Sequence, residues 1–592
     1  MTPWWDLYPG RLEHEIDKLE AAGVVVQIDK DVQTNDNLLQ LELSIPPSIT
    51  GTVEIAASAT FPDCYPYLPP KVFLPGFQMP HHLNPFTKEI CLLGVPGEDW
   101  APGDTLSRLL TEQLAEALRA GTDDQAGGSW NETKQAEPYG AYYNNYLRST
   151  AVLIDGDWKL PAEVRGGYID FKFAGPLPPP DAQDRTIGAA CTVRTDSNQM
   201  LAELPAQLRD LFASPVLTGR WTRVDAPIQL DNAKSFWEAA AHEDSGHTPI
   251  LNHAGTKIEL RAVVFPEEIG LREAADGWVF AVKVHSGPRA TSSIPKSKKR
   301  QRLTPVVVPD QYFLLRPARA GRRDFSARLP ELSPLARRQV LVVGAGAVGS
   351  AVSLQLARAG MKGIMVMDPD TLEPGNLVRH AGTFEQVGMP KAVAVCKSLV
   401  SAYPYVAAKF SEAAVGAPRR AGEAERTSAL LGTIAEYDLV IDATAELTAQ
   451  RLLAKVTRDC GKPYLFLDAT NGAWGGLVGL IRAESTWCYT CFEYYLSDGT
   501  IVLPPSSPAP RTQPVGCALP TFTGAGFDLD EVSLHAARTA AAYLCEGNEN
   551  AYPAISSDVD VVQLRDPEGN RSLPVWTGYK LNRHEKCQEH LL

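Results

Sequence analysis

The spacing of hydrophobic residues divides the chain into stretches of different secondary structure. Residues 3–23 carry hydrophobic residues at helical spacing, and three short β-rich runs follow within residues 24–58. A helix followed by such a meander is typical of an α+β domain. Residues 61–76 contain too many prolines for a regular element, whereas residues 106–120 have a strong helical pattern. The Gly/Asp/Ser-rich stretch 121–130 then predicts a loose connection.

A second pattern begins at residues 339–360, where a hydrophobic strand, a glycine turn and a helix follow one another. Further hydrophobic strands at intervals predict a Rossmann-like α/β arrangement. Between about 150 and 325 the strand-like and helical pieces carry no recognisable chemistry, and we interpret the basic run 295–302 as a solvated loop. The fold class is therefore multidomain α+β and α/β. The expected domains are residues 1–147, a middle linker domain of unknown role at 148–325, and residues 326–592.

Length and composition narrow the class of protein. The chain has 592 residues, which is too long for a single hydrophobic core. Hydrophobic residues make up 44% of it and charged residues 21%, as in globular proteins. No apolar run approaches the roughly 20 residues of a membrane span, and the acidic N-terminus lacks a signal-peptide pattern. Subtracting 70 acidic from 56 basic residues leaves −14, which argues against a nucleic-acid partner. We therefore expect a cytoplasmic protein with no membrane or nucleic-acid partner.

The glycine turn has the pattern of a phosphate-binding loop. Gly344, Gly346 and Gly349 form G-x-G-x-x-G between a strand and a helix, and Asp368 ends the next strand. Such a loop closes on phosphates at a helix N-terminus, and the acid binds a ribose, whether the ligand is NAD, FAD or ATP. Arg379 and Lys391 follow downstream. Two cations suit a triphosphate better than a dinucleotide pyrophosphate, and therefore favour ATP.

The order of these motifs resembles the adenylation domain of the ThiF/MoeB and ubiquitin-activating enzyme family, over roughly residues 326–592. Enzymes of that family adenylate the C-terminal carboxylate of a protein with ATP and Mg²⁺. The resemblance implies that Asp368 holds the ribose, that the segment 437–446 lines the magnesium side, and that the remaining nucleotide contacts come from the D-x-D acid, the N-x-x-R pair and the lysine, namely Asp370, Asn376, Arg379 and Lys391.

Positions 445 and 328 also bear on the nucleotide site that the resemblance implies. The family usually has an acid directly after Thr444, but Ala445 stands there, which leaves Asp442 or Glu446 as substitutes. Arg328 resembles the upstream arginine that such enzymes extend across a homodimer to the ATP. The resemblance therefore also implies a homodimer.

Ten cysteines are too few for a disulfide scaffold of this length. Cys488 and Cys491 form C-x-x-C, and Cys587 and His590 form C-x-x-H near the C-terminus. Two such pairs supply the four ligands of a tetrahedral zinc, as in the structural Zn²⁺ of the family. His584 is an alternative ligand to His590, and a redox pair or buried thiols are the alternatives to zinc.

Cys517 lies in a Pro/Gly-rich segment that leads into a helix. This segment resembles the crossover loop of ubiquitin-type activating enzymes, whose cysteine attacks the acyl-adenylate and forms a thioester. Cysteine is intrinsically nucleophilic and an acyl phosphate is highly activated, so no strong base is required beside it. Cys396, Cys460 and Cys545 stand in helical or apolar runs and are expected to be core residues.

Cys91 belongs to the first domain and follows the pattern Y-P-x-x-P-P, a His/Asn segment and I-C-L, with Trp100 nine residues later. This order resembles ubiquitin-conjugating enzymes over roughly residues 1–147, with Cys91 at the position of their thioester cysteine. The family's His-Pro-Asn is replaced by a segment in which Asn84 is displaced by one position. An asparagine amide there stabilises the oxyanion formed when an amine attacks the thioester. Cys64 is expected to be structural.

A chain that joins these domains resembles the bacterial fusions of anti-phage (CBASS) operons, which join the C-terminus of a cGAS-like nucleotidyltransferase to a target amine. The implied reaction runs from acyl-adenylate to Cys517, then to Cys91, then to an amide. The acyl donor stays open, since a ubiquitin-like protein could replace the nucleotidyltransferase. Sulfur-carrier adenylation, an NAD-dependent oxidoreductase and a catalytically inactive scaffold are the remaining alternatives.

Overall fold

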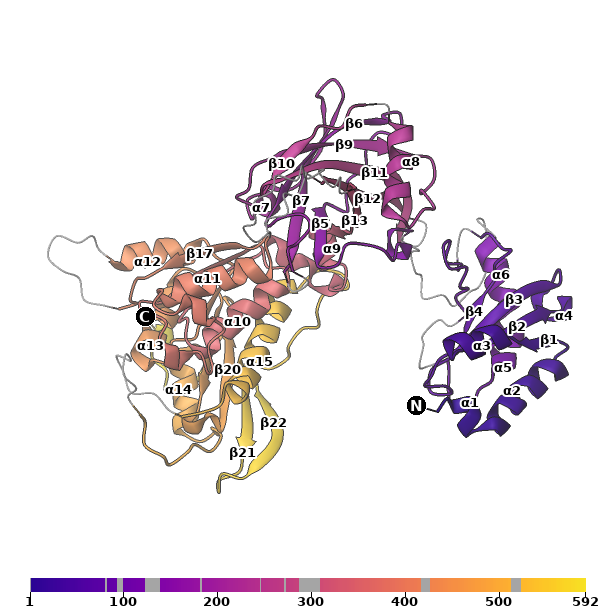
Figure 1. Cartoon of the computed structure of the whole chain (residues 1–592). Helices are drawn as coiled ribbons and strands as arrows, with labels where there is room; N and C mark the ends of the chain where they lie inside the picture. The colour runs from indigo at the N-terminus through magenta and orange to yellow at the C-terminus, as the bar shows by residue number, and fades with distance from the viewer. Residues whose placement is uncertain are drawn as a thin grey trace, which may run out of the picture. The chain divides into compact units, whose positions relative to one another are not determined.

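The computed structural model describes most of the chain (Figure 1). The described residues are 2–79, 82–92, 99–122, 139–181, 184–244, 246–270, 273–286, 309–416, 426–512 and 523–591. They divide into two compact units, residues 1–321 and 322–592. We describe each unit by itself.

The N-terminal domain has the expected α+β fold. Its antiparallel sheet has the order β1-β2-β3-β4, and in β2 every second residue is buried because one face of the sheet packs on the helices. Within the proline-rich stretch, where no regular element was expected, three residues pair with β3 to form β4. The elements are α1 (Trp4–Leu7), α2 (Pro9–Ala21), β1 (Val25–Ile28), α3 (Lys30–Asp36), β2 (Leu39–Ile45), α4 (Pro47–Thr50), β3 (Ile55–Phe61) and β4 (Lys71–Phe73).

The predicted helix at 106–120 is present and runs from α5 (Leu106–Leu109) through a π-helical turn (Leu110–Leu114) into α6 (Ala115–Thr122). Thr105 caps its N-terminus through Arg108 N. The fully buried Glu15 of α2 accepts a hydrogen bond from Leu106 N at 2.9 Å and a further one from the Tyr65 hydroxyl. This buried carboxylate therefore joins α2 to the start of the α5 helix.

The middle domain is built on a mixed sheet with the order β13-β12-β11-β9-β6-β7-β5-β14, with β10 beside β11 and β8 beside β7. The longest strands, β11 and β12, pair with each other beside β13, and α8 packs against these three strands. The basic run 295–302 lies outside the described residues. The elements are a 3₁₀ turn (Tyr139–Tyr142), β5 (Thr150–Ile154), β6 (Gly166–Phe173), β7 (Thr186–Thr195), β8 (Met200–Glu203), α7 (Ala206–Arg209), β9 (Leu217–Arg223), α8 (Ala233–Glu243), β10 (Leu251–His253), β11 (Thr256–Gly270), β12 (Glu273–His285), β13 (Gln311–Leu315) and β14 (Pro317–Arg319).

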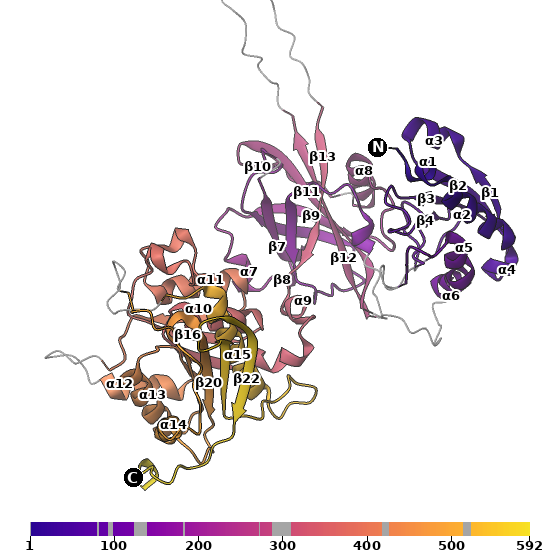
Figure 2. The ribbon, with the colours of Figure 1, turned by 90° about the horizontal axis from the view of Figure 1, so that it is seen from below.

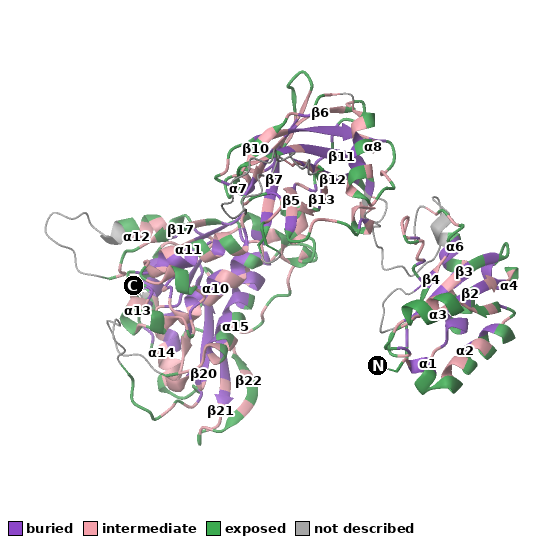
Figure 3. Cartoon of the chain, in the orientation of Figure 1, coloured by how far each residue is buried: buried purple, intermediate pink, exposed green. Residues whose placement is uncertain are grey.

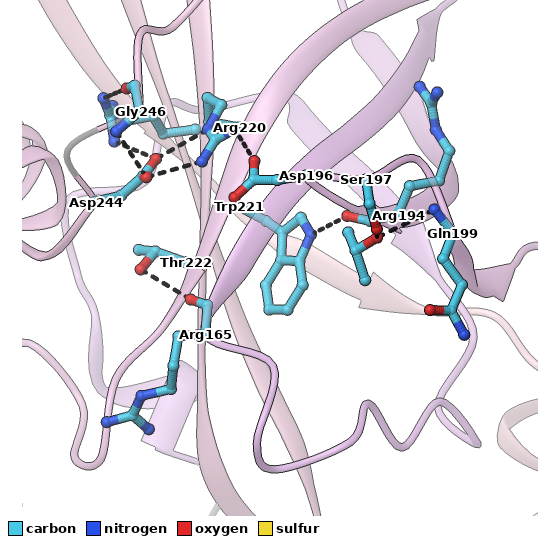
Figure 4. A network of polar contacts seen from close by, with 12 residues as sticks. Arg165, Arg194, Asp196, Ser197, Gln199, Arg220, Trp221, Thr222, Asp244 and Gly246 are labelled. Atoms are coloured by element: carbon cyan, nitrogen blue, oxygen red, sulfur yellow. Dashed lines mark hydrogen bonds and ion pairs between the residues drawn. The ribbon is translucent and has the colours of Figure 1, made fainter.

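A buried ion-pair network holds one side of this sheet (Figure 4). Asp244, just after α8, accepts two hydrogen bonds from Arg220 of β9, at 2.9 and 3.0 Å, and one from Arg261 of β11 at 3.3 Å. Each of the three side chains is less than 10% exposed. Gly246 donates to Asp244 at 2.9 Å and has no room for a Cβ, which would meet the Arg220 guanidinium at 2.4 Å. One carboxylate thus connects α8 to two strands.

The C-terminal unit is the expected doubly wound α/β fold. Its sheet has the order β17-β16-β15-β18-β19-β20-β21-β22, parallel from β17 to β19 and antiparallel from there on. Helices α10, α11 and α15 cover one face, and α12, α13 and α14 cover the other (Figure 2). The central strands are therefore buried on both sides, as Figure 3 shows.

The elements of this unit are α9 (Arg322–Ser326), β15 (Gln339–Val343), α10 (Ala347–Arg358), β16 (Gly363–Met367), α11 (Lys391–Ala402), β17 (Ala407–Ser411), α12 (Arg426–Ala435), β18 (Leu439–Asp442), α13 (Leu447–Asp459), β19 (Tyr464–Ala469), β20 (Gly475–Ile481), α14 (Tyr489–Ser497), α15 (Gly526–Cys545), β21 (Val559–Arg565) and β22 (Arg571–Tyr579), with 3₁₀ turns at Pro330–Arg337, Pro374–Asn376, Phe384–Gln386, Asn471–Ala473 and Glu589–Leu591. Among the described residues, no helix is long and apolar enough to cross a membrane.

Asp244→Ala is expected to destabilise the middle domain by about 3 kcal/mol, because it leaves the buried Arg261 without its ion-pair partner and leaves Arg220 with only the exposed Asp196. Hydrogen exchange of β9 and β11 peptides, followed through a urea titration, measures the change. The control is Asp225→Ala, which breaks the exposed ion pair of Asp225 with Arg165 and is expected to change nothing measurable. Equal exchange in both variants would contradict the role given to Asp244.

Candidate functional site

The glycine loop joins β15 to α10 at the carboxyl edge of the parallel sheet. Gly344 has φ +92°, and a Cβ there would meet Ala443 O at 2.6 Å. A Cβ on Gly349 would meet Gly344 O at 1.9 Å. Glycine is therefore required at both positions for the strand and helix to approach this closely, which leaves the N-terminus of α10 at the edge of the sheet, where a phosphate binds.

Asp368, directly after β16, is bound to this loop. Its Oδ2 accepts a hydrogen bond from Ala345 N at 2.7 Å, and its Oδ1 accepts one from Asp370 N at 2.8 Å. Burial raises the pKa of the carboxyl, while the two backbone hydrogen bonds oppose that rise. Each oxygen keeps a second lone pair, so the carboxylate can still accept hydrogen bonds from a ribose.

The downstream predicted residues converge on the same edge. Lys391, the first residue of α11, places Nζ 2.9 Å from Asp370 Oδ2. Thr371 and Pro390 form a β-bridge beside this pair. Asn376 uses its side-chain oxygen to accept from Glu373 N at 2.9 Å, which leaves its amide hydrogens as the donors for a phosphate. Asp368, Asp370 and Lys391 thus form a directly connected group.

His380 also contacts the glycine loop, although no sequence motif indicated it. It is only 7% exposed; its Nε2 lies 2.8 Å from Ala345 O, and its Nδ1 accepts from Gly382 N at 2.8 Å. These partners define a neutral ring with the proton on Nε2. Burial lowers the pKa of the imidazole, which agrees with that state. A histidine next to Arg379 carries no signal in a single sequence.

The two substitutes for the acid missing at Ala445 are both occupied. Asp442 is fully buried, and its oxygens accept from Tyr464 Oη at 2.6 Å and from Thr444 N and Oγ1 at 2.9 and 2.7 Å. Glu446 caps the N-terminus of α13, accepting from Ala449 N at 2.7 Å. In this arrangement Asp442 shapes the turn that places Ala445 at φ +51°. Asp442 Oδ2 and Glu446 Oε2 each accept one of these hydrogen bonds and keep a second lone pair, but Asp442 is fully buried.

Asp468, near the end of β19, is a second group that the sequence did not indicate. Burial raises its pKa to about 7, while a 2.8 Å hydrogen bond from Gln450 opposes that rise and the negative charge of Asp442 adds to it. Hydrophobic strands often end in an acid, so nothing in the sequence distinguished this one.

The four proposed zinc ligands come together. The ligand atoms of Cys488, Cys491, Cys587 and His590 all lie within 4.8 Å of one another. The sulfur of Cys488 is 3.8 Å from that of Cys491 and 3.6 Å from that of Cys587, and Cys491 Sγ is 3.3 Å from His590 Nε2. Tetrahedral Zn–S bonds of about 2.3 Å require sulfurs about 3.8 Å apart, so the group fits this metal.

His584, the alternative ligand, has other partners. Its Nε2 lies 3.0 Å from Asp498, its Nδ1 accepts from Lys586 N, and its ring stacks on Tyr494. Its backbone N donates to Cys491 Sγ at 3.3 Å, as expected for a group that orients a ligating thiolate. The geometry therefore selects His590 for the cluster and leaves His584 beside it.

In the N-terminal domain Cys91 is exposed. Leu83 and Ile90 form a β-bridge, and Cys91 N donates to His82 O at 2.9 Å, so the His/Asn segment and the cysteine lie side by side. Asn84 Oδ1 accepts from Phe86 N and Thr87 N at 2.9 and 3.0 Å, so these two hydrogen bonds do not use its amide hydrogens.

The remaining residues named from the sequence lie in the N-terminal domain and in the C-terminal unit. Trp100 is buried and donates to Pro66 O at 2.8 Å. Cys64, expected to be structural, is exposed instead because it lies in the turn after β3. Arg328 is exposed between α9 and the 3₁₀ turn that follows it. Cys396 and Cys545 are buried as expected, and Cys460 is partly buried.

Cys517 lies outside the described residues. Described residues on both sides of it contact the same 3₁₀ turn, Asn471–Ala473. Asn471 donates to Ser507 O and Ala509 O at 2.7 and 2.8 Å. On the other side, a Cβ on Gly524 would meet the Ala473 Cβ at 2.8 Å, so Gly524 packs closely on the same turn. Ser507, Ala509 and Gly524 therefore all contact the turn Asn471–Ala473, which follows β19 directly.

Comparisons with known proteins agree with this architecture. Residues 324–533 match the model of the ThiF family, and residues 17–152 match that of prokaryotic E2 family B. The chain thus carries a region similar to prokaryotic E2 family B and, further along, a region similar to the ThiF family.

Relatives cover the whole chain or part of it. The uncharacterized protein y4oA of Sinorhizobium fredii is 28% identical over 99% of this chain and 97% of its own length. The ATP-dependent ubiquitin transferase-like protein Cap2 of Enterobacter hormaechei is 30% identical over 26% of this chain and 24% of its own. Among solved structures, E. coli MccB with ATP aligns with a TM-score of 0.32 and 17% identity over 43% of this chain and 68% of that one.

Asp468→Asn is expected to gain stability relative to the unsubstituted protein as the pH rises from about 4 to 7. A carboxyl whose pKa is raised by burial binds its proton more tightly in the folded state, so its stabilisation is lost as pH rises through that window, whereas asparagine stays neutral. Urea midpoints at pH 5 and pH 8 measure the difference. Asp566→Asn, in an exposed turn, should give the same difference at both pH values; the same result for Asp468→Asn would contradict the prediction.

Proposed function

We propose that this chain is an ATP-dependent protein ligase. It adenylates the C-terminal carboxylate of a protein, carries the acyl group as a thioester on Cys517 and then on Cys91, and joins it to a target amine. The observation that carries the proposal is the presence, in one chain, of a ThiF-family domain with a connected nucleotide-binding group and an E2-like domain with an exposed cysteine.

The first step needs two negatively charged reactants to meet. The donor carboxylate attacks the α-phosphorus of ATP, a new P–O bond forms, and the bond to the departing pyrophosphate breaks. In our proposal Asp368 orients the ribose, and Asn376, Arg379 and Lys391 neutralise the phosphates at the edge where α10 begins. Magnesium would supply further neutralisation of the phosphates. Asp442 acts through the turn it shapes, and Arg328 of a partner subunit completes the site in a homodimer.

Three acyl transfers follow, of which one, from Cys517 to Cys91, is between two sulfurs. The Cys517 thiolate attacks the acyl carbon and AMP leaves. The Cys91 thiolate then displaces Cys517, and the amine displaces Cys91, with the amide hydrogens of Asn84 stabilising the oxyanion of that last step. The exposed position of Cys91 supports this assignment because both the incoming thioester and the amine must reach its sulfur.

The cluster of Cys488, Cys491, Cys587 and His590 is proposed to hold a structural Zn²⁺. It joins α14 to the C-terminal segment, which carries the last two ligands. Four protein ligands leave no open position, which is typical of structural rather than catalytic zinc.

The donor we propose is a cGAS-like nucleotidyltransferase, as in the CBASS fusions that the domain order resembles. The similarity to Cap2, whose name describes a ubiquitin transferase-like protein, supports this class of reaction. The same chemistry with a ubiquitin-like donor is the alternative. Sulfur-carrier adenylation is a further one, but it gives the E2-like domain and Cys91 no role.

Cys91→Ala is expected to abolish amide formation while an ATP-dependent, thiol-sensitive adduct on Cys517 is retained, because only the second transfer needs Cys91. Tagged protein is incubated with ATP, magnesium and native-host lysate, and shifted bands are compared on reducing and non-reducing gels and mapped by mass spectrometry.

The control is Cys64→Ala, which removes the other exposed cysteine of the same domain and should retain both the adducts and the amide product. Amide formation in Cys91→Ala would contradict the proposal. Adenylation with sulfur transfer and no thioester would favour the sulfur-carrier alternative.

The purified protein is expected to contain about one zinc per chain. His590→Gln should lose most of this zinc because it removes a ligand, whereas His584→Gln should keep it because His584 bonds to Asp498. Metal content by mass spectrometry after dialysis gives the result. Zinc loss from His584→Gln alone would assign the fourth ligand to His584, and a metal-free wild-type protein would contradict the site.

A further inference from the structure

His380 joins two segments that both belong to the proposed nucleotide site. One is the glycine loop, whose Ala345 O lies 2.8 Å from His380 Nε2. The other is the segment 376–382, which contains Arg379. The ring is only 7% exposed, so these contacts are shielded from competing water.

The glycine loop is held from its other side by Asp368. Ala345 N donates to Asp368 Oδ2 at 2.7 Å while Ala345 O faces His380. The backbone N–H and C=O of Ala345 are thereby both hydrogen-bonded, the N–H to Asp368 and the C=O to His380. From Asp368 the connection continues through Asp370 N to the ion pair of Asp370 with Lys391.

Further contacts hold the segment around Arg379 in place. Ala381 N donates to the fully buried Ser350 Oγ of α10 at 3.1 Å, and Gly382 N donates to His380 Nδ1. A Cβ on Gly526, the first residue of α15, would meet Arg379 Cα at 3.3 Å, so this helix packs against the same segment. The contact of His380 Nε2 with Ala345 O connects this segment directly to the glycine loop.

We propose that His380 is a positioning residue for ATP: its Nε2–H holds the segment of Arg379 against the glycine loop, so that the arginine and the loop act on the same phosphates. This inference rests on the proposed function. A role limited to folding of the segment would depend instead on the local bond between Nδ1 and Gly382.

Two substitutions separate these roles. Glutamine places an amide donor near the position of Nε2, and asparagine places an acceptor near that of Nδ1. We expect His380→Gln to bind ATP within about threefold of the unsubstituted protein and His380→Asn to bind about tenfold more weakly, the effect of one lost hydrogen bond. Titration calorimetry with Mg·ATP on the full chain, without a donor, measures both dissociation constants.

A second readout excludes a simple loss of folded protein. In ATP–pyrophosphate exchange with the acyl donor identified in the lysate experiment, His380→Asn should raise KM for ATP about tenfold and change kcat by less than about threefold. A smaller folded fraction would lower kcat and leave KM unchanged. Unchanged ATP affinity in His380→Asn, or equal weakening in both variants, would overturn the inference.

Further outcomes include unfolding of both variants and failure of the unsubstituted protein to bind ATP. If both variants unfold, Ser350→Ala releases the same segment from α10 and should weaken ATP binding about threefold; unchanged affinity in that variant would overturn the inference. If the unsubstituted protein binds no ATP, the proposed function fails together with this role. If it binds ATP and only the comparison of glutamine with asparagine fails, the proposed function stands without it.

Discussion

The proposed nucleotide site depends on how one residue of the glycine loop, Ala345, is held. Its N–H is bound to Asp368 and its C=O to His380. Gly344 can reach φ +92° and Gly349 can approach Gly344 O only because neither has a side chain. Because these glycines have no side chains, the loop can pack closely at the edge of the sheet. Hydrogen bonds then hold it in that position. A loop fixed before the nucleotide arrives avoids the entropic cost of ordering it on binding.

The three domains are stabilised in different ways. The strands of the C-terminal unit are buried on both faces and rely on hydrophobic packing, as doubly wound sheets do. The middle domain adds buried ion pairs around Asp244. Such pairs contribute little net stability but are costly to break, so they favour one arrangement over others. In our proposal a zinc bound by Cys488, Cys491, Cys587 and His590 stabilises the segment near Cys587, which has few hydrophobic residues of its own.

Sequence patterns predicted the elements well where hydrophobic periodicity was strong. The run 39–45 forms β2 as expected, and the helix at 106–120 extends two residues further. The two pairs that end at Cys491 and His590 were recognisable because each pair is local, although the pairs are about a hundred residues apart in the chain. The proline-rich stretch was only partly predictable, because β4 is formed by pairing with β3 and not by its own propensity.

Side-chain partners were beyond the reach of the sequence. Asp442 and Glu446 are equally plausible magnesium acids by position, but tertiary hydrogen bonds from Tyr464 and a helix N-terminus occupy them. The roles of His380 and Asp468 depend on contacts with residues far along the chain. The middle domain shows no motif because its ion pairs involve arginines and aspartates that look like ordinary surface residues until the strands bring them together.

Fusion of the two domains changes the order of the proposed transfer reaction. Sixteen residues, 123–138, connect α6 to the first turn of the middle domain, and an extended chain of that length spans at most about 55 Å. Two thiols on one tethered chain meet at an effective concentration on the order of millimolar if the tether can span them. The step from Cys517 to Cys91 then becomes first order in protein. In a homodimer each Cys517 would have two such acceptors, one on its own chain and one on the partner, and neither would require release of the acyl group.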